Sequence, residues 1–135
     1  MDIQNCCAFT GHRPAHFGFK HDETHVDCIA LKTAMREAIQ SLVHRGVVTY
    51  FSGMALGVDM WGAEIVLELK EQYPELRLIA VLPCETQAKP WLAAQQKRHL
   101  ELLSRCDRVI YISRQYTPNC MLQRNRYMVD RKSVV

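Results

Sequence analysis

The chain has 135 residues, a length typical of one domain rather than two. Hydrophobic residues make up 48% of the chain and charged residues 23%, which excludes a disordered, collagen-like or low-complexity protein. The formal net charge of +3 is too small to indicate nucleic-acid binding by itself, so no nucleic-acid partner is expected. We therefore expect a single globular domain over residues 1–135.

The sequence also argues against a membrane protein and a secreted protein. It has no apolar run of membrane-spanning length, and its first residues lack the basic-then-apolar pattern of a signal peptide. Six cysteines are present, but none forms a Cys-x-x-Cys pair, so a zinc ribbon and a thioredoxin-type redox site lack their spacing. We expect reduced thiols, a cytoplasmic location, no membrane partner and no cofactor.

Short apolar segments alternate with amphipathic ones along the chain. Residues 3–10 form an apolar run that predicts a buried strand, and the polar residues 12–23 predict a loop. An apolar stripe with helical spacing covers residues 26–43, preceded by a capping box at Thr24 and Asp27. The remaining predicted elements are a helix C-cap at Gly46, strands at residues 47–51, 76–82 and 108–113, and helices at residues 58–73, 90–105 and 120–130. This alternation predicts a parallel sheet with helices on both faces.

The turn after the second predicted strand is the most informative segment. Ligands of open α/β sheets lie beyond the carboxyl ends of the strands, near a switch in strand order. Ser52 opens this turn, and Gly53 and Gly57 allow the backbone to approach a ligand closely. The N–H groups that open the next helix favour an anion, so phosphate is expected there, while Asp59 either caps the helix or binds a ribose hydroxyl or a base donor. A tight turn without any ligand explains the spacing equally well.

The segment after the first predicted strand is the second candidate. Thr10 offers a hydroxyl, Gly11 a backbone that a ligand can approach, and Arg13 a guanidinium fork for phosphate or carboxylate. The alternative is an arginine paired with a carboxylate such as Asp59 or Glu85. An arginine directly after a buried strand favours the ligand.

Two weaker features come from single residue types. The residues His12, His16, His21 and His25 crowd one loop and the start of a helix. Their spacing fits no metal-binding motif, so no metal site is expected. Cys84 follows the third predicted strand, and we expect it to line the pocket rather than to act as a nucleophile.

Four motifs, in this order, resemble the YpsA-like branch of the SLOG superfamily. They are Thr-Gly-His-Arg-Pro at residues 10–14, the turn at residues 52–59, Leu-Pro-Cys-Glu at residues 82–85 with Gln87 and Trp91, and residues 124–130. The resemblance spans nearly the whole chain and implies a Rossmann-like three-layer α/β/α sandwich with a mostly parallel sheet. It also implies relatives among the LOG phosphoribohydrolases and DprA proteins, and a nucleotide or nucleotide-derived ligand. On matching positions it marks Gly11, Arg13, Ser52, Gly53, Gly57 and Asp59 as pocket residues, with Gln87, Trp91, Arg124 and Asn125 as contributors; Thr10 and Glu85 complete the candidate set from the strand ends.

The sequence departs from that family at its C-terminal end. Chains of this branch continue into a further strand and a Gly-Gly-Thr turn, whereas this sequence stops at Val135. We therefore expect one or more C-terminal strands to be missing, a sheet edge to be exposed, and the second phosphate-binding turn to be absent. The LOG-type Pro-Gly-Gly-x-Gly-Thr motif is also absent, which argues against hydrolysis by that route.

Three hypotheses about function follow. The first is a module, forming a homo-oligomer, that binds a nucleotide or another phosphorylated small molecule. The second is an enzyme acting on a nucleotide or nucleoside, with Asp59 or Glu85 as acid or base. The third is a scaffold that assembles through a helix face or an open sheet edge.

Overall fold

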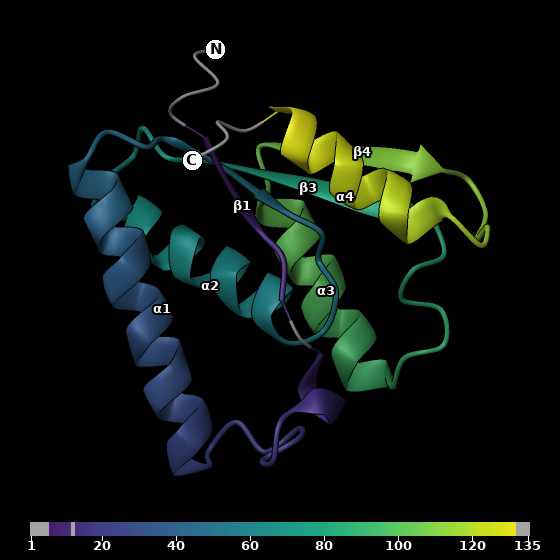
Figure 1. The fold of residues 1–135 in the computed structure, drawn as a ribbon, viewed down its shortest axis with the longest axis horizontal. Coiled ribbons are helices and arrows are strands. Elements are labelled where there is room, and N and C mark those ends of the chain that lie inside the picture. Colours follow the sequence, from purple (N-terminus) through teal and green to yellow (C-terminus); the bar gives the residue numbers. More distant parts are fainter. Residues whose placement is uncertain (1–5, 12, 132–135) are drawn as a thin grey trace.

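A four-stranded parallel sheet forms the centre of the protein (Figure 1). The computed structural model describes residues 6–11 and 13–131. The strands are β1 (Cys6–Phe9), β2 (Thr49–Ser52), β3 (Arg77–Cys84) and β4 (Arg108–Ser113), and they lie side by side in that order. The predicted strands are confirmed, except that residues 3–5 of the first lie outside the described residues. The sheet is open, with β1 and β4 at its edges among the described strands.

Helices cover both faces of the sheet. They are α1 (Val26–His44), α2 (Val58–Lys70), α3 (Ala93–Arg105) and α4 (Cys120–Arg131), and a short 3-10 turn, η2 (Pro14–His16), lies in the first loop. Right-handed crossovers between strands adjacent in sequence place successive helices on the same face. Accordingly, α1, α2 and α3 lie on one side of the strands and α4 lies on the other (Figure 1). The predicted Rossmann-like α/β arrangement is thus confirmed.

The expected switch in strand order is absent among the four described strands. Their order follows the sequence, and all neighbouring pairs are parallel. A reversal requires a connection that returns to the other side of an earlier strand, and none of the three described crossovers does so. The carboxyl ends of all four strands still lie at one edge, so loops distant in sequence converge there.

Alternating side chains of the strands fill two hydrophobic cores. Tyr50 and Leu78 are fully buried in the core shared with α2. Phe51 and Val81 point to the opposite side and pack with Met128 of α4. The Tyr50 hydroxyl donates a hydrogen bond to the Val47 carbonyl at 3.0 Å, so its polar atom is satisfied inside the core. This alternation is the period of two that a strand imposes on its side chains.

Helix α2 is buried on nearly every side. Its first turn lies at the carboxyl edge of the sheet, and the packing around the helix holds it there. Phe17 and Phe19 from the loop after β1 pack their rings against Trp61, at centroid distances of 5.9 and 6.2 Å. A Cβ at Gly62 would lie 2.8 Å from the Phe9 ring, so glycine allows α2 to approach β1 this closely. The loop predicted as merely polar therefore supplies two aromatic side chains to the packing of α2.

The ends of α1 test the predicted caps. The N-cap is His25, whose Nδ1 accepts the Asp27 backbone N–H at 3.0 Å, so the predicted capping box is wrong. The reason is local: the Thr24 hydroxyl donates to Asp22 Oδ1 at 2.6 Å instead. Gly46 has φ +90° directly after the C-cap residue Arg45, and its predicted role at the C-terminal end of the helix is confirmed.

Two further helix predictions are inaccurate. Val26 and Ile29, which belong to the predicted apolar stripe, are 71% and 52% exposed, because α1 packs mainly against α2 rather than against the sheet. Helix α3 begins at Ala93 rather than at Pro90, since the Leu92 N–H is capped by Gln95 Oε1 at 3.0 Å.

An ion-pair cluster ties the first loop to α2 and α3. Arg98 Nη1 lies 2.6 Å from Glu23 Oε2, and Arg98 Nη2 lies 2.5 Å from Glu64 Oε1. Lys32 Nζ adds a second cation 2.5 Å from Glu23 Oε1. The Arg98 hydrogen bonds lower the pKa of Glu23 to about 2. Glu23 therefore stabilises the fold at neutral pH, and this contribution is lost as the pH falls through about 2.

Replacing Arg98 by methionine should lower the free energy of unfolding by about 1–2 kcal/mol at neutral pH, because the half-buried carboxylates lose their shared cation. Urea unfolding followed by circular dichroism measures this loss. Lys97→Met, an exposed neighbour on α3, is the matched control and should change stability by less than about 0.5 kcal/mol. Equal losses in the two variants would show that the cluster contributes nothing.

Candidate functional site

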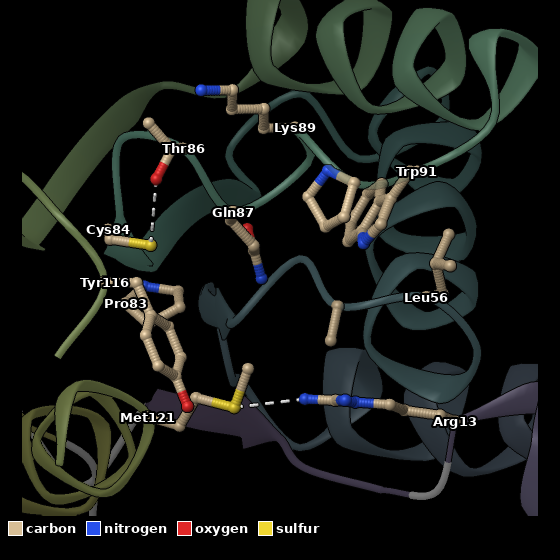
Figure 2. A pocket seen from close by; sticks show the side chains of 12 residues that line it. Arg13, Leu56, Pro83, Cys84, Thr86, Gln87, Lys89, Trp91, Tyr116 and Met121 are labelled. Atoms are coloured by element: carbon tan, nitrogen blue, oxygen red, sulfur yellow. Dashed lines mark hydrogen bonds between the residues drawn. The ribbon is translucent and has the colours of Figure 1, made fainter. Parts of the chain in front are cut away.

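A pocket of about 640 Å³ lies at the carboxyl edge of the sheet. Each of the four segments that follow a strand contributes to it: Arg13 after β1, Leu56 after β2, Trp91 after β3 and Tyr116 after β4. Met121 of α4 closes one side (Figure 2). The other lining residues are Ala55, Pro83, Cys84, Thr86, Gln87, Lys89 and Pro90.

The lining combines apolar and aromatic surface with positive charge. Arg13 and Lys89 lie on opposite sides of the pocket, as do Trp91 and Tyr116 (Figure 2). The described lining residues include no carboxylate. Tyr116 is 65% exposed and forms part of the rim. Such a pocket suits an anion that also carries a flat apolar group.

The Arg13 guanidinium is available to a ligand. Its Nη2 donates to Met121 Sδ at 3.0 Å, and a thioether sulfur is a weak acceptor that a phosphate oxygen readily replaces. None of the ion pairs within residues 6–11 and 13–131 involves Arg13. The alternative considered above, a pair with Asp59 or Glu85, is therefore not formed in the described structure.

Asp59 lies in a buried position beside the pocket rather than on its wall. It is 4% exposed, and its carboxylate accepts the backbone N–H groups of Ala55 and Gly11. Burial raises the pKa of Asp59 to about 6, although the positive charges of Arg124 and Arg13 oppose this shift. Asp59 therefore joins the loops that follow β1 and β2.

Gly53 is the meeting point of this buried polar network. Its carbonyl accepts hydrogen bonds from Arg124 Nη1 at 2.7 Å and from Gln87 Nε2 at 3.0 Å. Arg124 is 5% exposed, and burial lowers its pKa. Its Nε donates to Asn125 Oδ1 at 2.7 Å. A Cβ at Gly53 would overlap the Arg124 guanidinium, so this glycine makes room for a side chain of the protein itself.

The turn between β2 and α2 is held by Ser52. Its hydroxyl donates to the Asp59 carbonyl at 2.8 Å and accepts the Met54 N–H at 3.1 Å. Met54 has φ +57° and Gly57 has φ +93°, so the turn uses the left-handed region twice. Gly57 is the N-cap of α2 and provides no side-chain acceptor for the N–H groups of its first turn.

The structure divides the predicted site residues into three groups. Arg13, Gln87 and Trp91 line the pocket. Gly11, Ser52, Gly53, Asp59, Arg124 and Asn125 belong to the polar network next to it, and Gly57 shapes the turn. Thr10 and Glu85 are exposed and lie outside the lining residues. The predicted site residues omitted Leu56, which lies in the turn examined after the second strand, and also Thr86, Lys89 and Tyr116, which lie just beyond the predicted strand ends.

Three further predictions concern metal sites, thiols and membrane-spanning helices. Within residues 6–11 and 13–131, no three His, Cys, Asp or Glu side chains are grouped as a metal site requires, and His12 lies outside these residues. All six cysteines are free thiols, and Cys84 lines the pocket. No helix in the described part of the chain has the length and apolar character needed to span a membrane.

The open parallel sheet, the helices on both faces and the pocket at the carboxyl edge define a Rossmann-like α/β domain. The family model of the YspA SLOG family (YpsA) matches residues 7–135, and the chain belongs to this family. Its curated relatives include the UPF0398 proteins of Bacillus thuringiensis (strain Al Hakam) and Bacillus cereus (strain Q1). Each is 30% identical over 131 residues, which cover 95% of this chain and 70% of the relative. The resemblance seen in the sequence motifs is confirmed.

Proposed function

We propose that the pocket binds a nucleotide or a nucleotide-derived phosphorylated ligand. The observation that carries this proposal is that one pocket is lined by both the Arg13 cation and the Trp91 indole. The described lining of this pocket has no carboxylate. A guanidinium binds phosphate through a bidentate fork, and an indole offers a face on which a base stacks. The volume of about 640 Å³ lies within the range typical of small-molecule sites.

The proposal assigns the phosphate to Arg13 rather than to the start of α2. Asp59 lies in the first turn of α2, and above a pH of about 6 its carboxylate is charged. A phosphate bound at that turn would meet this negative charge. At the Arg13 side the ligand instead meets a cation whose hydrogen-bond acceptor among the described residues is the Met121 sulfur.

The adenine or another base is assigned to the aromatic side chains. Trp91 is half-buried, with its ring at the pocket, and Tyr116 lies across from it (Figure 2). Stacking on such side chains contributes about 1–3 kcal/mol per base and tolerates different bases. We therefore expect the affinity to depend strongly on the phosphate and on the presence of an aromatic base, and less on which base it is.

Calorimetric titration with ADP, adenosine and inorganic phosphate tests this assignment. ADP should bind more tightly than adenosine or phosphate, since it engages both Arg13 and Trp91. Arg13→Ala should weaken ADP binding by about tenfold or more, the effect expected for losing a charge-assisted hydrogen bond. Arg108→Ala is the matched control, because Arg108 is exposed at the amino end of β4, the opposite edge of the sheet.

The proposal fails if ADP does not bind, or if Arg13→Ala binds ADP as tightly as the unchanged protein. Binding without any change in ADP supports the binding module, whereas release of AMP and phosphate would support the enzyme hypothesis. Neither Asp59 nor Glu85 lines the pocket, so we assign no acid or base. The homo-oligomer and the cytoplasmic location stay predictions from the sequence.

A further inference from the structure

Two of the pocket-lining side chains rest on the same buried histidine. His99 of α3 is 6% exposed, and its Nε2 lies 3.2 Å from Gln87 Oε1. The rings of His99 and Trp91 make an edge-to-face contact, with centroids 5.0 Å apart and an interplanar angle of 88°. His99 itself does not belong to the pocket lining. It therefore touches the wall of the pocket from behind.

The hydrogen bonds determine which atoms face each other. The Gly53 carbonyl only accepts, so Gln87 must turn its NH₂ group toward it, at 3.0 Å. Gln87 Oε1 then faces His99 and needs a donor, which places a proton on His99 Nε2. Burial lowers the pKa of His99, so the ring is neutral at neutral pH, with Nδ1 unprotonated. One tautomer thus gives each end of the Gln87 amide a hydrogen-bond partner.

We propose that His99 is a positioning residue of the ligand pocket: it fixes the Gln87 amide by a hydrogen bond and the Trp91 indole by an edge-to-face contact. The consequence for binding rests on the proposed function, whereas the positioning itself is a property of the free protein. Both amide ends of Gln87 are used by the protein, so Gln87 presents a fixed surface to the ligand. Trp91 gains a defined ring orientation, which reduces the entropy lost when a base stacks on it.

The same contacts connect the pocket to the buried network. Gln87 bonds to Gly53, whose carbonyl also accepts from Arg124. Loss of the His99 donor would leave Gln87 Oε1 buried without a partner, which is costly, so the amide must rotate or move. Such a movement shifts the pocket wall without removing any residue that touches the ligand.

Two substitutions separate positioning from simple packing. His99→Leu fills the buried position with an apolar side chain and removes the donor. His99→Gln can instead place an amide N–H near the position of Nε2. In nitrogen–proton correlation spectra of the free protein, the Trp91 indole signal is assigned by its loss in Trp91→Phe. We expect this signal to move in His99→Leu and to stay near its original position in His99→Gln. ADP binding should weaken by about tenfold in His99→Leu and by less than about threefold in His99→Gln.

Controls make each outcome decisive. Leu102→Val alters another buried position of α3 and should leave the Trp91 signal in place. Gln87→Met removes the acceptor from the other side and should move the signal even if His99→Leu does not fold. An unmoved Trp91 signal in both His99→Leu and Gln87→Met, or equal effects of His99→Leu and His99→Gln, would overturn the proposal. If ADP fails to bind the unchanged protein, the proposed function fails, but the spectra still decide the role of His99.

Discussion

Replacing Arg124 by methionine should lower the free energy of unfolding by about 3 kcal/mol at neutral pH. Arg124 donates to the Gly53 carbonyl at 2.7 Å, and its charge opposes the cost of burying Asp59. Methionine fills much of the same volume but supplies neither the donor nor the charge. The Asp59 carboxylate would then remain in a site where it is 4% exposed, without its principal cation.

Urea unfolding at neutral pH measures this loss, with Arg126→Met as the matched control. Arg126 is exposed on the same helix, so the same change of side chain should alter stability by less than about 0.5 kcal/mol. Adding Asp59→Asn should recover part of the loss, because the neutral amide no longer needs a buried cation. A loss below about 1 kcal/mol for Arg124→Met, or no recovery in the double variant, would contradict the electrostatic stabilisation of Asp59 by Arg124.

The ionisation of Asp59 should make the protein less stable as the pH rises from about 4 to about 6. Its pKa in the folded protein is raised from 3.8 to about 6, chiefly by burial. The folded state therefore holds the proton more tightly than the unfolded state. The resulting stabilisation is fully present below the unfolded pKa and is lost as the pH passes the folded pKa. The shift corresponds to about 2–3 kcal/mol.

Comparison with Asp59→Asn isolates this effect from the other titrating groups. The difference in unfolding free energy, unchanged protein minus variant, should fall by about 2–3 kcal/mol between a pH of about 4 and about 7. Glu23 and His99 change stability with the opposite sign in acid, since both have lowered pKa values, but they contribute equally to the two proteins. A difference that is constant with pH would show that Asp59 titrates normally.

The elements of the fold could be predicted because each carries its own local signal. Gly46 ends α1 with a positive φ, and the apolar residues around Trp61 distinguish the buried helix α2. The order of the strands could not be predicted. Buried parallel strands such as β2 and β3 have similar apolar patterns, and these patterns do not indicate which strand pairs with which.

The candidate site was only partly predictable for a related reason. Arg13 and Trp91 were found because strand-end segments and family motifs mark them. Lys89 and Tyr116, which line the same pocket, were missed because the path of a loop in space decides which of its residues line a pocket. The sequence does not show that path. Asp59 was expected to face a ligand, but Arg124 comes from a distant helix and binds the same turn from the other side. Such long-range polar contacts leave no local pattern in the sequence.

A crystal structure of the protein grown with saturating ADP tests the central claim most directly. We expect the diphosphate within hydrogen-bond distance of the Arg13 guanidinium, displacing the Met121 sulfur, and the adenine stacked on the Trp91 indole. Density for the ligand at the start of α2, away from Arg13, would contradict the assignment of the phosphate. A pocket that stays empty under saturating ADP would contradict nucleotide binding itself.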